Sequence, residues 1–154
     1  MKKHLLALAA VAVGLAVPTT ATAATPAEAV KADAAKLQTD VVAKKTTLVA
    51  DVQKLVADAA AAKSLSKADA RAAMKADLTQ LRADRKAAQA TIKADRAQLK
   101  TDLAAAKQVA GAQAELRPTL KSLRQTERQT RKEIRAQLRQ ARQALRELRA
   151  SFRK

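Results

Sequence analysis

The chain has 154 residues, with 31 lysines and arginines against 14 aspartates and glutamates, which gives a formal net charge of +17. It contains no cysteine, tryptophan or tyrosine and only one histidine. The lack of cysteine excludes disulfide bonds and metal–thiolate sites, and the large positive charge predicts anionic partners.

The N-terminal segment over 1–23 has the pattern of a cleaved secretory signal peptide. A basic start over 1–4 precedes an apolar run over 5–17, and residues 21–23 form an A-x-A cleavage site. The apolar run is too short for a retained membrane anchor, which needs about 20 residues. We therefore expect an exported protein, periplasmic or extracellular, whose mature chain over 24–154 is a single elongated helical domain with no transmembrane segment.

The mature chain is rich in alanine and poor in large apolar side chains. Residues 24–154 hold 34 alanines but only 25 Val, Ile, Leu, Met and Phe residues, and their net charge is +15. Alanine is the strongest helix former, whereas few large apolar residues and a high net charge are typical of disordered chains. We expect helices with a thin core, stabilised by self-association or by a partner that binds only the helical state.

The first helix has a clear start. Thr25 is placed as an N-cap, Pro26 occupies the first helical position, and Glu28 completes a capping box. The chain from there to Ala110 contains neither glycine nor proline, but Ser66 begins a second S-x-x-D capping pattern. The sequence therefore predicts a break near Ser66; without it, 26–110 would be one continuous rod.

A second break is expected before the last helix. Gly111 suits a helix C-terminus, and Pro118 suits a helix start while disfavouring helical geometry at the residue before it. A short connection over 111–117 folds the last helix back antiparallel on the one before it. We predict an all-α fold, in which long Ala-rich helices pack as an antiparallel hairpin or three-helix bundle with coiled-coil character. The expected helices are about 26–63, 67–110 and 118–153.

Aspartates recur at sequence steps that alternate between seven and eleven. They are Asp33, Asp40, Asp51, Asp58 and Asp69, followed by Asp77, Asp84, Asp95 and Asp102. Because one step of each kind, taken together, makes about five full turns of an α-helix, each set stays on one face of a nearly straight helix. A lysine or arginine two positions before several of them predicts a solvated, salt-bridging face with ionised carboxylates rather than a metal site.

Arginines form a continuous row on the last helix, beside an apolar stripe that runs from Leu123 to Phe152. The row, called the arginine row below, consists of Arg124, Arg128, Arg131, Arg135, Arg139, Arg142, Arg146, Arg149 and Arg153. Their mean spacing of about 3.6 residues places them along one side of a helix. Arginine offers a planar fork that binds phosphate, sulfate or carboxylate in a bidentate manner.

Two interpretations of the arginine row remain open. In the first, the arginines face the aspartates of the earlier helices and form salt bridges across the bundle, each weak at a surface. In the second, they form an external polyanion-binding site that acts through counterion release. Pairing all 14 acidic residues would still leave fifteen cations of the mature chain unmatched, so internal pairing cannot account for the whole charge.

Catalysis is not expected. The mature chain lacks His, Cys, Tyr and Trp and has one glycine, so it offers neither a His- or Cys-based nucleophile or base nor a phosphate-binding loop. We predict no catalytic residue, cofactor or metal. Phe152 is the only aromatic residue, which together with export argues against intracellular nucleic acid as the partner. A cell-envelope polyanion, a glycan or an anionic lipid surface fits better.

The chain resembles two groups of exported helical proteins. It is similar to the Spy/CpxP chaperones in size, signal peptide, helical character and basicity, although their L-T-x-x-Q phrase is not met at Leu78 and Thr79. That resemblance implies a periplasmic chaperone or scaffold for acidic protein clients. The chain also resembles the heparin-binding adhesins of mycobacteria, which join a coiled coil to a basic, Ala-rich C-terminus. A further alternative is a desiccation-type stress protein, because Ala/Lys/Asp phrases recur at eleven-residue steps.

Overall fold

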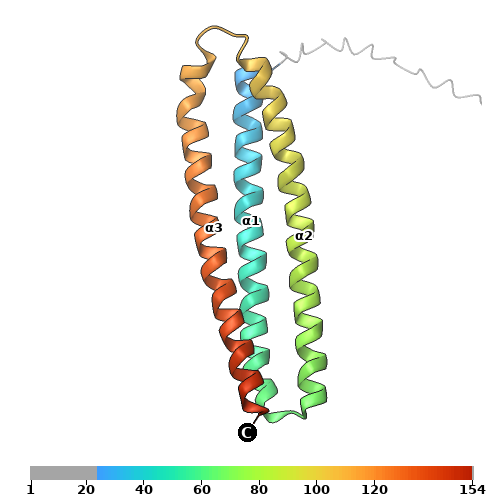
Figure 1. Cartoon of the computed structure of the whole chain (residues 1–154). Coiled ribbons are helices and arrows are strands. Elements are labelled where there is room, and N and C mark those ends of the chain that lie inside the picture. Colours follow the sequence, from blue (N-terminus) through green and yellow to red (C-terminus); the bar gives the residue numbers. More distant parts are fainter. Residues whose placement is uncertain (1–23, 154) are drawn as a thin grey trace, which may run out of the picture.

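The protein is built from three long antiparallel helices (Figure 1). A computed structural model describes residues 24–153, so the predicted signal peptide lies outside the described residues. Helix α1 (Pro26–Ala61) is followed by a 3-10 turn, η1 (Ala62–Ser64), and by helices α2 (Lys67–Ala106) and α3 (Ala112–Ser151). The predicted all-α bundle is confirmed, and no strand occurs within the described part of the chain.

Side-chain caps fix the starts of α1 and α2. The Thr25 hydroxyl accepts a hydrogen bond from the Glu28 backbone N–H at 3.3 Å, and the Glu28 carboxylate accepts one from the Thr25 N–H at 2.8 Å. After η1 the chain becomes extended at Leu65, and the Ser66 hydroxyl accepts from the Asp69 N–H at 3.2 Å. Each cap satisfies backbone donors that have no partner within the helix. Residues 26–110 are therefore two helices rather than one rod.

The third helix starts earlier than the sequence predicts. We expected a connection over 111–117, but α3 begins at Ala112, directly after Gly111 at φ 81°. Glycine adopts this left-handed conformation without a steric penalty, so the chain turns within a few residues. The start of α3 gains burial, because Ala112 is 4% and Leu116 only 1% exposed. That burial favours the helix even though Pro118 lacks an N–H for the carbonyl four residues earlier.

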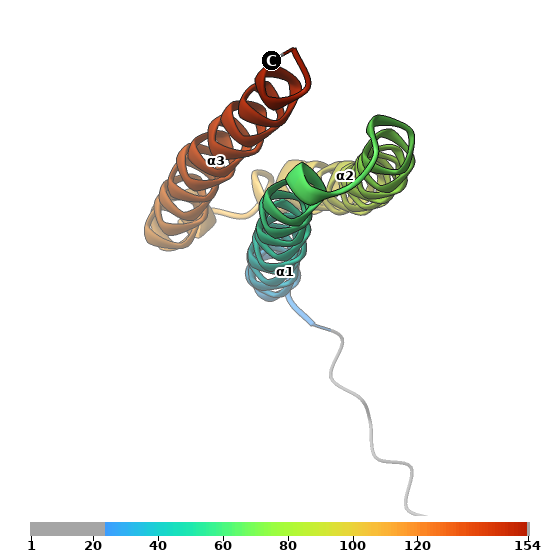
Figure 2. The ribbon, with the colours of Figure 1, turned by 90° about the horizontal axis from the view of Figure 1, so that it is seen from below.

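Helix α1 is the central element. Helices α2 and α3 each pack along it, and a view along the axes shows them diverging from α1 on separate sides (Figure 2). Apolar residues of α1 at helical spacing, from Val30 to Ala59, form the core with both neighbours. Among residues 24–153, no helix combines the length and the apolar character that crossing a bilayer requires.

Candidate anion-binding groove

All nine side chains of the arginine row are exposed, eight on α3 and Arg153 just after its end. Within residues 24–153, none of them lies within ion-pair distance of a carboxylate. Three of the four acidic residues of α3 pair instead with the other helices, among them Glu133, whose Oε2 lies 3.1 Å from Lys45 Nζ, and Glu115, which pairs with Lys31. The first interpretation, in which the row pairs with the aspartates, is therefore wrong.

The aspartates of α1 and α2 face one another across the interface between these two helices. The pairs are Asp33 with Asp102, Asp40 with Asp95, Asp51 with Asp84, and Asp58 with Asp77. The two residue numbers of every pair add up to 135, as expected for one uninterrupted antiparallel register. The predicted salt bridges occur at two of these pairs, but the prediction of a solvated face is wrong for all eight residues, because their side chains are half-buried or buried between the helices.

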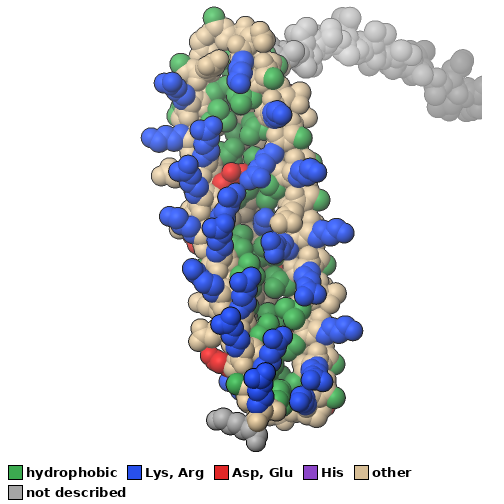
Figure 3. Space-filling model, viewed as in Figure 1, with side chains coloured by type: hydrophobic (Ala, Val, Ile, Leu, Met, Phe, Trp, Pro, Cys, Tyr) green, Lys and Arg blue, Asp and Glu red, His purple; other side chains and the backbone are tan. Residues whose placement is uncertain are grey.

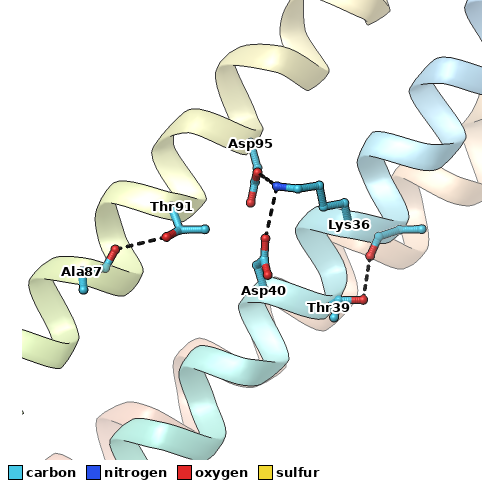
Figure 4. Close-up of polar contacts among 7 residues, drawn as sticks. Lys36, Thr39, Asp40, Ala87, Thr91 and Asp95 are labelled. Atoms are coloured by element: carbon cyan, nitrogen blue, oxygen red, sulfur yellow. Dashed lines mark hydrogen bonds and ion pairs between the residues drawn. The ribbon is translucent and has the colours of Figure 1, made fainter.

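Two of the four pairs are bridged by a lysine of α1. Lys36 donates to Asp95 on α2 and, at 3.4 Å, to Asp40 on its own helix (Figure 4). The Lys36 ammonium holds the pKa of Asp95 below its ordinary value, although that residue is only 7% exposed. Lys54 repeats the arrangement with Asp77 and, at 2.6 Å, with Asp58. The Lys54 ammonium likewise holds the pKa of Asp58 below its ordinary value.

The other two pairs have no lysine between them. One carboxyl oxygen of Asp33 and one of Asp51 is buried without a hydrogen-bond partner, as is one oxygen of Asp77 and of Asp95 in the bridged pairs. Burial raises the pKa of Asp33, with Asp102 adding to it, and burial and then Asp84 raise the pKa of Asp51. The expectation that neighbouring cations keep the aspartate pKa values from rising is wrong at these two positions, because burial and a facing carboxyl raise them.

Both kinds of pair recur eighteen positions further along the chain. The set Asp33, Lys36 and Asp40 returns in α1 as Asp51, Lys54 and Asp58. The partner set Asp77 and Asp84 returns in α2 as Asp95 and Asp102. The α1–α2 hairpin therefore contains two copies of one structural repeat, each with one bridged and one unbridged carboxyl pair.

A long groove runs between α2 and α3, with α1 beneath it. Apolar side chains occupy its middle, and lysines and arginines line both sides (Figure 3). Its middle section, about 440 Å³, contains Leu48 of α1 and Ile134 of α3. A section nearer the α1–α2 connection, about 700 Å³, is lined by Met74, Leu78 and Phe152.

The α2 side of the groove carries a second row of cations that sequence reasoning missed. This α2 basic row consists of Lys67, Arg71, Lys75, Arg82, Arg85, Lys93, Arg96 and Lys100. Its members follow one another at steps of three, four, seven or eight, which is a helical signal that is visible in the sequence. The signal was obscured because most of these residues lie two positions before an aspartate, where they were interpreted as its salt-bridge partners.

The arginine row contributes unevenly to the opposite side. Arg124, Arg131, Arg135, Arg149 and Arg153 line the groove. The other four, Arg128, Arg139, Arg142 and Arg146, are exposed on α3 without lining these sections. One ion pair spans the groove, between Arg96 Nη2 and Glu127 Oε1 at 2.7 Å. Apart from Arg96, no cation of either row has a carboxylate partner within residues 24–153.

Comparison with known proteins gives no match to a family model, a curated protein or a solved structure. The resemblances drawn from the sequence therefore stay predictions. Within residues 24–153, no three His, Cys, Asp or Glu side chains are grouped so that they could hold a metal ion.

Proposed function

We propose that this is an exported, non-enzymatic helical protein that binds anionic partners of the cell envelope through the arginine row. The observation that carries the proposal is that all nine arginines are exposed and unpaired in the described chain. Eight of the 14 acidic residues lie between α1 and α2, away from this row. The protein therefore presents a cationic surface that its own carboxylates do not neutralise.

Binding by such a row depends mainly on counterion release. Nine arginines over about 45 Å of helix match a partner with closely spaced negative charges, such as an anionic glycan, a teichoic-acid-like polymer or an anionic lipid surface. Because arginine forms paired hydrogen bonds with phosphate, sulfate and carboxylate, each contact adds orientation to the charge attraction. Export, which favours envelope partners over intracellular nucleic acid, rests on the signal-peptide pattern of residues 1–23.

The chaperone-like alternative is favoured by a different observation. The groove places an apolar floor between two cationic rows, and unfolded acidic proteins carry both complementary features. In that alternative, binding depends on apolar contacts and persists partly at high salt. In the polyanion proposal, binding falls steeply as salt rises.

Heparin binding at a series of salt concentrations tests the proposal. Replacing Arg135, Arg139, Arg142 and Arg146 with glutamine removes four row charges while keeping good helix formers. We expect weaker binding and a shallower dependence of log K on log salt, because fewer counterions are released.

The matched control replaces four exposed, unpaired lysines outside both rows. These are Lys63, Lys86, Lys107 and Lys132, also changed to glutamine. The control variant should bind heparin more tightly than the arginine variant at every salt concentration. Equal weakening of the two variants would mean that net charge alone attracts heparin, and the proposed site would be rejected.

A further inference from the structure

Cations from all three helices converge in the middle section of the groove. Lys44 rises from α1, Arg85 and Arg96 come from α2, and Arg131 comes from α3. Glu127 pairs with Arg96, but Lys44, Arg85 and Arg131 have no carboxylate partner among residues 24–153. Three unpaired cations thus share one small, concave space.

Lys44 is the unusual member of this group. It is half-buried on the floor of the groove, whereas Arg85 and Arg131 are exposed. Burial lowers its pKa, and Arg85, Arg96 and Arg131 lower it further. Holding a desolvated ammonium next to like charges is unfavourable unless an anion joins them. The geometry therefore provides a place for one anionic group.

An apolar track extends from this cation cluster toward the α1–α2 connection. Beneath it, the core-facing residues from Leu48 to Ala62, about 21 Å of helix, are buried. Half-buried apolar side chains of the outer helices lie along it, including Leu78, Leu138 and Leu145. An extended alkyl chain that starts beside Lys44 can lie along this track and cover these side chains.

The dimensions favour a small amphiphile over a macromolecule. The middle section, at about 440 Å³, falls in the range of small-ligand sites. A flat membrane would meet the two cationic rows but would not reach the recessed Lys44. A second copy of the chain would bring its own net positive charge to the same place.

We propose that the groove between α2 and α3 binds a single anionic amphiphile, with its phosphate group at Lys44, Arg85 and Arg131 and its alkyl chain along the apolar track. This inference rests on the proposed function, since it names one class of anionic partner and the residues that hold it. The alkyl chain supplies apolar burial, and the three cations supply specificity for a charged headgroup.

Calorimetric titration of the mature protein with dodecyl phosphate tests the proposal. Inorganic phosphate and the neutral dodecyl maltoside serve as comparison ligands, all at one salt concentration and below micelle formation. We expect dodecyl phosphate to bind at least tenfold more tightly than either. Binding of inorganic phosphate equal to that of dodecyl phosphate would reject the track, and equal binding of dodecyl maltoside would reject the anion site.

Variants at position 44 locate the headgroup. Lys44→Met should weaken dodecyl phosphate binding about tenfold, the size expected for one charge-assisted hydrogen bond, whereas Lys44→Arg should retain most of it. The control is Lys86→Met, which removes the same charge from an exposed position outside the groove. Circular dichroism shows whether each variant is folded. Equal affinities of the Met variants would reject the assignment to Lys44.

Heparin binding separates this proposal from the broader one. The Lys44→Met variant should bind heparin as tightly as the Lys86→Met variant, because a recessed lysine contributes little to contact with a long polymer. If dodecyl phosphate does not bind while heparin binds normally, the amphiphile site alone would be rejected. Normal heparin binding by the arginine variant would reject the proposed function instead.

Discussion

The two sides of α2 carry charges of opposite sign. Toward α1, it presents aspartates that meet the aspartates of α1 in four pairs, two of them bridged by lysines. Toward the groove, it presents cations that face the cations of α3, with one acidic partner at Glu127. A regular 18-residue spacing places each kind of charge on its own side. The net charge of the protein is thereby concentrated at the groove instead of being spread over the surface.

The same two sides differ in packing. The interface with α1 buries leucines completely, whereas the groove leaves leucines half-exposed between cations. Helix α1 therefore stabilises the fold, and the groove leaves apolar and cationic groups free for a partner. Substitutions on the two sides should change different measured quantities.

The largest effect on stability is expected inside the core. Leu55 is 0% exposed, and Leu55→Ala should lower the free energy of unfolding by about 2–5 kcal/mol, because it leaves a cavity. Leu145→Ala on the groove side should cost less than half as much, since that leucine is only partly buried. Urea denaturation measures both. Equal losses would show that the groove is packed as tightly as the core.

A smaller loss is expected from removing a bridging lysine. Lys36→Met leaves Asp40 and the buried Asp95 without the ammonium between them, so the melting temperature should fall at pH 7. The loss should shrink as the pH falls below the ordinary aspartate pKa of 3.8, because the lowered pKa of Asp95 stabilises the fold only while that group is ionised. Lys63→Met, at an exposed and unpaired position, is the control and should have no comparable effect.

The unbridged pairs should show the opposite sign. Asp51→Asn removes one of two adjacent carboxyls, so the melting temperature should rise at pH 7. Because the pKa of Asp51 is raised, its carboxyl takes up a proton at a higher pH in the folded protein than in the unfolded chain. The stabilisation that this carboxyl provides is present below pH 3.8 and is lost as the pH rises through its raised pKa. The gain in melting temperature from Asp51→Asn should therefore vanish on acidification. A gain that persists at pH 3 would contradict this account.

The smallest effect on stability is expected from the arginine row. The variant with Arg135, Arg139, Arg142 and Arg146 replaced by glutamine should keep its free energy of unfolding within about 0.5 kcal/mol, because unpaired surface residues contribute little. Thermal and urea denaturation measure this directly. A clear loss of stability would mean that these arginines have partners in solution, and the contrast between the two sides of α2 would fail.

Local signals in the sequence predicted the helices well. Thr25 and Glu28 lie three positions apart and each accepts a hydrogen bond from the other's backbone N–H, so their capping box needs no tertiary information. The cap at Ser66 is equally local: its hydroxyl accepts from the Asp69 N–H and donates to the Asp69 carboxylate. Pro118 misled the prediction because its local preference for a helix start competes with the burial of Leu116, which depends on contacts with distant residues.

Relations between helices were harder to predict. Spacing showed that Asp33 and Asp51 share a face of one helix, but not that Asp102 and Asp84 would lie opposite them. That outcome depends on the register between α1 and α2, which the short connection at Leu65 fixes. For the same reason, the sequence left open whether the arginine row meets aspartates or solvent. Lys44 carried no distinguishing signal, because its surroundings come from three different helices.

The 18-residue repeat makes the length of this protein modular. Removing one such unit, which is about 27 Å of helix, returns every remaining side chain to the same orientation about the axis. The arginine row follows the same rule, since Arg142, Arg146, Arg149 and Arg153 each lie one unit beyond another row member. Excising one unit from each of α1, α2 and α3 would give a shorter bundle with the same kinds of contact and a groove of the same cross-section. The length of the cationic groove can thus be changed in fixed steps, independently of its chemistry.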